Sequence, residues 1–191
     1  IIILDTTCQY DFGPGQSTDE IMYNHGIHGV QDMCNLLKRN GKTYFVEAGH
    51  WQYSDVIERV IRRVRAATLA KALRSARVGI AGEPFKGMGD FAVPYSELRS
   101  EIGIETISYD FKWAERQIEE ITQEEIESDI QKCRDLFQID DSSQEVWERS
   151  EKVNLTIRKW IEKEKLDACT INFLATEKQP GLPVMPFLEI S

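Results

Sequence analysis

The sequence has 191 residues, of which 41% are hydrophobic and 29% charged, as is ordinary for a folded, water-soluble chain. The formal net charge of −9 argues against binding to nucleic acid or to an anionic membrane, because phosphate groups require a positive protein surface. The four cysteines are widely spread without a CxxC pair, which favours reduced thiols in the cytoplasm over a disulfide framework or a zinc site.

Both ends of the sequence are predicted to be cuts within a longer protein. The apolar run 1–4 is predicted to be a strand, and 13–15 (Gly-Pro-Gly) supplies turn chemistry after it. We therefore expect residues 1–17 to be the end of a preceding domain and its linker. From 180 the chain becomes apolar again and stops without a cap or a polar tail, so 177–191 is predicted to begin a segment that leads to a further domain.

Between these ends, residues 18–176 alternate between helix and strand patterns and are predicted to form one α/β domain. Helical spacing of apolar residues appears at 29–37, 55–73 and 94–98, and in the charged region 113–165, where 140–143 separates two helices. Strand patterns appear at 43–46, 77–81, 104–109 and 168–173. This alternation predicts a doubly wound, mostly parallel sheet of the Rossmann or flavodoxin-like kind, with right-handed crossovers.

Ligands of such sheets bind outside the carboxyl ends of the strands. That rule indicates four places: the stretch after the first strand, 49–53, 82–90 and 173–181. Neither GxGxxG nor GxxxxGK[ST] occurs, so a nucleotide-phosphate cradle is not predicted.

Two histidine clusters are candidate sites. His25 and His28 stand at i, i+3 where a helix is expected to start, and a metal site would need a third ligand that the motif lacks. They are interpreted as polar residues of a sugar site or as helix-capping residues. His50 and Trp51 follow a strand and are equally consistent with a sugar-stacking platform and with packing. No nucleophile–base pattern stands out, so the residues alone leave the enzyme class open.

The sequence resembles the L-arabinose and L-fucose isomerase superfamily, specifically the central domain of its arabinose-isomerase-like branch. Residues 24–29 (NHGIHG) are similar to the family pattern Asn-Gln-x-x-His-Gly, with His25 where arabinose isomerases carry Gln. The other blocks follow in the family order: 48–51 (AGHW) with 55–59, 77–80 leading to 88–93 (MGDFAV), and 170–173 (TINF) leading to 180–183 (PGLP).

The resemblance implies an aldose–ketose isomerase that uses Mn²⁺, with the metal ligands and acid–base glutamates in a C-terminal catalytic domain downstream of this chain. The chain itself would then hold neither metal nor catalytic residue. It would supply sugar contacts, and the family's pocket positions fall on His25, His28, Met88, Thr170 and Phe173. The family also implies a homo-oligomer, a hexamer, with sites shared between subunits. The alternative is a sugar-binding α/β module without catalysis.

Overall fold

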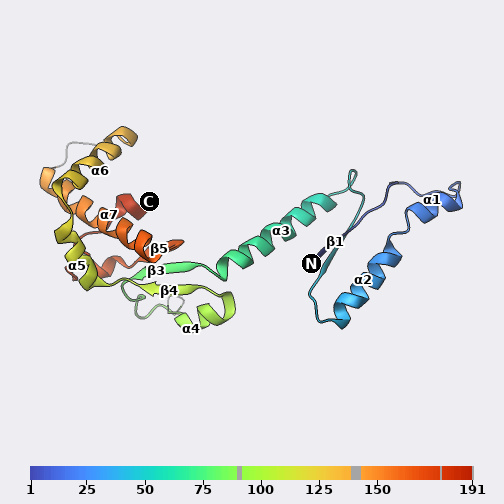
Figure 1. The fold of residues 1–191 in the computed structure, drawn as a ribbon, viewed down its shortest axis with the longest axis horizontal. Helices are drawn as coiled ribbons and strands as arrows, with labels where there is room; N and C mark the ends of the chain where they lie inside the picture. The colour runs from blue at the N-terminus through green and yellow to red at the C-terminus, as the bar shows by residue number, and fades with distance from the viewer. Residues whose placement is uncertain (90–91, 139–142, 177, 191) are drawn as a thin grey trace. The chain divides into compact units, whose positions relative to one another are not determined.

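The computed structural model describes residues 1–89, 92–138, 143–176 and 178–190, and it is a mixed α/β structure. The chain divides into two compact units, 1–71 and 72–191, each with its own parallel sheet (Figure 1). Each unit is described by itself. No helix within the described ranges is both long and apolar enough to cross a membrane.

Unit 1 is built on two parallel strands, β1 (Ile2–Asp5) and β2 (Phe45–Ala48). Between them run α1 (Thr18–Tyr23) and α2 (Ile27–Arg39), and α3 (Val56–Leu73) follows β2 and continues into unit 2. Helix α1 is absent from the sequence prediction. Its signal is a capping box, in which Ser17 accepts from the backbone of Glu20 while the Glu20 carboxylate accepts from the Ser17 backbone.

Unit 1 has a thin core. Ile3 and Val56 are its buried apolar residues among those described, and Glu47 is buried with them. A buried carboxylate requires partners, and Glu47 has ion pairs of 3.0 Å with Arg59 and 2.9 Å with Arg63. The negative charge of Glu47 on β2 is thus compensated by two arginines of α3.

Unit 2 contains a three-stranded parallel sheet in the order β4-β3-β5. Its strands are β3 (Arg77–Ala81), β4 (Glu105–Ser108) and β5 (Ala168–Ile171). A short α4 (Tyr95–Glu97) and the π-helix η1 (Leu98–Ile102) connect β3 to β4. Three helices then return the chain to β5 on the other side of β3: α5 (Phe111–Glu120), α6 (Gln123–Leu136) and α7 (Gln144–Glu164).

The core of unit 2 lies between the sheet and α7. Trp160 of α7 is buried against β3, where Gly79 leaves room for the indole ring. After β5 come η2 (Phe173–Ala175) and α8 (Phe187–Ile190), and between them Leu182 is fully buried in the same core. Tyr109 donates a hydrogen bond of 3.0 Å to the Gly181 carbonyl. Residues 178–190 therefore pack as part of unit 2.

The prediction of an α/β fold with parallel strands is confirmed. One finer expectation is wrong: the charged region holds three helices, because Thr122 begins a new helix with a second capping box to Glu125. Of the predicted separator 140–143, only Ser143 lies within the described residues, and it caps α7. The domain boundaries at 17/18 and 176/177 stay predictions.

Candidate functional site

A cavity of about 320 Å³ lies at the carboxyl ends of β3 and β5, with a second hollow of about 650 Å³ adjoining it. We call the first the strand-end cavity and the second the outer hollow. They share Ile80, the loop 82–85, Tyr95 and Asn172. This is the edge of a parallel sheet at which ligands bind.

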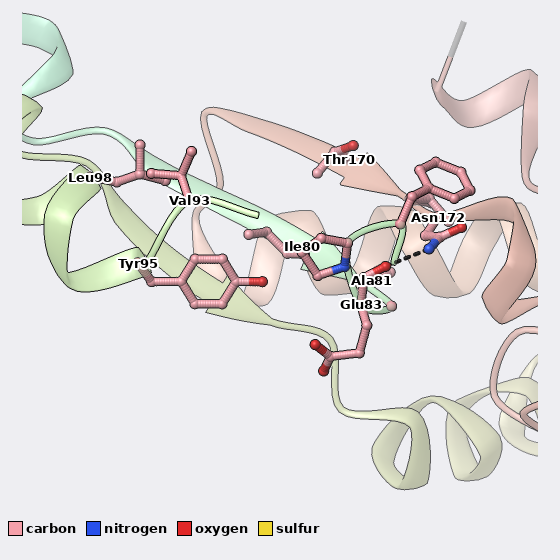
Figure 2. Close-up of a pocket in the computed structure, with 12 residues that line it drawn as sticks. Ile80, Ala81, Glu83, Val93, Tyr95, Leu98, Thr170 and Asn172 are labelled. Atoms are coloured by element: carbon pink, nitrogen blue, oxygen red, sulfur yellow. Dashed lines mark hydrogen bonds between the residues drawn. The ribbon is translucent and has the colours of Figure 1, made fainter. Parts of the chain in front are cut away.

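The walls of the strand-end cavity follow from strand alternation. Because successive side chains point to opposite faces, Gly79 and Cys169 face α7, while Ile80 and Thr170 face the opposite side. On that side Figure 2 shows Tyr95 with its hydroxyl directed toward Ile80. Val93 and Leu98 close the far end, so the cavity is mainly apolar with a few hydroxyl and amide groups.

Asn172 fixes the loop that separates the two hollows. Its side-chain amide donates to the Glu83 carbonyl (Figure 2), and its backbone N–H donates to the Ala81 carbonyl at 2.9 Å. Its side-chain oxygen caps η2 by accepting from Leu174 N–H at 2.9 Å. Gly82, at φ +94°, turns the chain here, and a Cβ on it would lie 2.8 Å from the Ala175 Cβ and 3.1 Å from the Asn172 Cβ. One residue thus ties the ends of β3 and β5 together.

Tyr109 lines the outer hollow and is buried, which raises the pKa of its hydroxyl. It therefore remains a neutral donor to the Gly181 carbonyl across the accessible pH range. This bond holds the segment after η2 against the sheet.

Three of the predicted site residues belong to unit 2. Thr170 lines the strand-end cavity. Phe173 contacts the ring of Phe85 with centroids 5.4 Å apart, and Phe85 lines both hollows. Met88 is half exposed on the loop after β3 and is not among the described residues that line either hollow. Asp90 and Phe91, from the same sequence block, lie outside the described residues.

His25 and His28 belong to unit 1, where they contact each other edge to face with ring centroids 4.1 Å apart. Both are exposed at the start of α2. The preceding Asn24 is anchored, since its side-chain oxygen accepts from Gln9 N–H at 3.0 Å and its amide donates to the Glu20 carbonyl. The pair is thereby fixed beside the loop that follows β1.

Sequence reasoning did not single out the residues that shape the cavity, namely Ile80, Glu83, Tyr95 and Asn172. The strand-end rule did indicate the loop 82–90, which contains Glu83, and the stretch 173–181, which follows Asn172. The specific signal for Asn172 is an amide placed directly after a strand and directly before the apolar turn 173–175, which is a capping position.

No family model matches the sequence, and a search of curated proteins gave no significant match. Within the ranges that the structure describes, no three His, Cys, Asp or Glu side chains gather as a metal-ligand group.

Proposed function

We propose that this chain is part of a cytoplasmic aldose–ketose sugar isomerase of the L-arabinose and L-fucose isomerase type, to which it contributes substrate-pocket residues. The main support from the structure is the strand-end cavity, which has the size of a small-molecule site and is lined by Thr170. The proposed activity is inferred from the sequence blocks that resemble the family. The finer fold, a doubly wound Rossmann-like domain, belongs to the same proposal.

In this proposal the sugar's carbon chain packs on the apolar wall formed by Ile80, Leu98 and the Phe85–Phe173 ring pair. The hydroxyls of Thr170 and Tyr95 are neutral donors and acceptors for sugar hydroxyls. By the same resemblance the Mn²⁺ ligands belong to the family's catalytic domain, so no metal ligand is assigned to the side chains of this chain. No reaction step is therefore assigned to side chains of this chain.

The first test is sugar binding at the strand-end cavity. L-arabinose and L-fucose are titrated into the protein while the Thr170 methyl resonance is followed by NMR. We expect a saturable shift, and Thr170→Val should weaken binding by roughly five- to tenfold, the value of one hydrogen bond. Thr18→Val, an exposed threonine on α1, is the matched control. No shift with either sugar would contradict a sugar site here.

The second test is turnover by the enzyme that contains this chain, assayed with Mn²⁺. The family resemblance assigns a sugar contact to His28, so His28→Ala should lower kcat/KM by about tenfold or more while the subunit stays folded, the effect of losing one hydrogen bond. Gln31→Ala on the exposed face of α2 is the control. Sugar binding with no isomerisation in the enzyme that contains this chain would favour the non-catalytic sugar-binding module.

The family resemblance also leads us to expect a hexamer with sites shared between subunits. Sedimentation measures the oligomeric state.

A further inference from the structure

A cluster of aromatic rings forms in unit 1 where the loops after β1 and β2 meet. We call Tyr10, His50, Trp51 and Tyr53 the His50 cluster. The His50 ring stacks on Tyr53 with centroids 4.8 Å apart and lies nearly parallel to Trp51 at 6.1 Å. Tyr10 meets His50 edge-on at 5.7 Å. The cluster lies at the carboxyl end of a parallel strand pair, the same kind of place as the strand-end cavity.

His50 is 8% exposed and its tautomer is determined by the backbone. Its Nδ1 accepts from the backbone N–H groups of Gln52 at 3.1 Å and Tyr53 at 3.2 Å. A nitrogen that accepts two N–H groups carries no proton, so the ring proton is on Nε2. Among the described residues, none accepts a hydrogen bond from Nε2. His50 therefore has a fixed donor without a partner in the protein.

The loop that carries these rings is held in place before any ligand arrives. The backbone N–H of Trp51 donates to Thr6 Oγ1 at 3.0 Å, and the backbone N–H of Gly49 donates to the Asp5 carbonyl at 3.0 Å. Ser54 Oγ donates to the His50 carbonyl at 2.7 Å. Trp51 nevertheless remains 54% exposed, and Tyr10 and Tyr53 more so. A rigid, exposed indole beside a fixed polar donor is not explained by packing within unit 1.

We propose that the His50 cluster is a second monosaccharide-contacting surface, in which Trp51 stacks on the C–H face of a neutral sugar and His50 Nε2 donates to one of its hydroxyls. The choice of a sugar rests on the proposed function. A neutral sugar is favoured over a sugar phosphate because the cluster contains no Lys or Arg and the chain carries a net charge of −9. Sugar C–H groups and an aromatic face are complementary, and one fixed donor gives orientation.

The test follows the His50 ring nitrogens by NMR in the whole chain during titration with L-arabinose and L-fucose. We expect the Nε2–H tautomer in the free protein and a saturable shift of its resonance on adding sugar. Trp51→Ala should raise the Kd measured at His50 at least fivefold. Tyr23→Ala, an exposed tyrosine of unit 1 outside the cluster, should change it less than twofold. Trp51 is exposed, so its removal leaves the fold intact.

Three results would overturn the inference: an Nδ1–H tautomer, a His50 resonance unmoved at saturating sugar, or a shift that follows protein concentration without sugar. The Thr170 methyl reports on the proposed function separately. A sugar-dependent shift of Thr170 with none at His50 would reject the His50 cluster and leave the strand-end site standing. A shift at His50 with none at Thr170 would support the cluster and reject the strand-end site.

Discussion

Glu151 lies in an unusual environment for a carboxylate. It is fully buried on α7, and neither of its carboxylate oxygens has a hydrogen-bond partner in the described structure. Burial, followed by the negative charge of Asp129, raises the pKa of Glu151 to about 7. Nearby, Arg158 pairs with Asp129 at 2.8 Å and with Glu189 of α8 at 2.6 Å. The guanidinium holds the pKa of Asp129 below its usual value.

The raised pKa of Glu151 predicts a loss of stability with rising pH that a substitution of Glu151 removes. A folded-state pKa raised above the unfolded value means that Glu151 lowers stability progressively as pH rises from about 4.5 to about 7. Glu151→Gln should therefore raise the free energy of unfolding at pH 8 by roughly 2 kcal/mol, and the gain should vanish near pH 4.5. Urea unfolding across this pH range measures it. Glu162→Gln, exposed on the same helix, should show no such profile.

At the scale of elements, the contact between β3 and α7 decides the geometry of unit 2. A Cβ on Gly79 would overlap Trp160 and the Leu166 side chain, both of which are held by the core. The glycine therefore sets how closely the helix approaches the sheet. Neighbouring Ile80, on the other face, is then positioned in the strand-end cavity.

Gly79→Ala should lower the free energy of unfolding by roughly 2–3 kcal/mol, because an overpacked core has to shift. The same change should move the Ile80 and Thr170 resonances, since both belong to the displaced strands. Gly13→Ala is the control, as nothing lies within 4 Å of its added Cβ. Equal stability of the two variants would show that α7 does not pack as described.

At the scale of the whole molecule, the two units differ in how much they bury. Unit 2 has two clusters of buried apolar residues, one of them joining the sheet, α5 and α7. Unit 1 has two parallel strands, and Ile1, Leu4, Phe45 and Val46 on or beside them are exposed. Parallel sheets are usually larger and covered on both faces.

Hydrogen exchange followed by mass spectrometry should therefore protect β3 and β5 at least tenfold more strongly than β1 and β2. The reason is that amide exchange follows the free energy of local opening, which depends on buried apolar contacts. Peptides that cover the whole chain allow the strands of both units to be compared in the same sample. Protection of β1 and β2 equal to that of β3 would contradict the described difference in burial.

Local patterns determined much of the secondary structure. The strand Arg77–Ala81 has its predicted bounds, whereas the capping boxes at Ser17 and Thr122 begin helices that the apolar pattern does not predict. These signals act over three or four residues, so the sequence carries them directly. The apolar pattern does not show the break at Thr122, because its charged surroundings resemble one continuous solvated helix.

The tertiary structure alone decided which strand ends meet. The order β4-β3-β5, the bond from Asn172 to Glu83 across 89 residues, and the docking of Leu182 all join distant segments. Such contacts depend on packing and loop closure, which a local sequence pattern does not predict. The sequence by itself therefore determined that strand-end loops would carry polar and aromatic residues. Only the folded chain decided that Thr170 lines a cavity and that the backbone fixes the tautomer of His50.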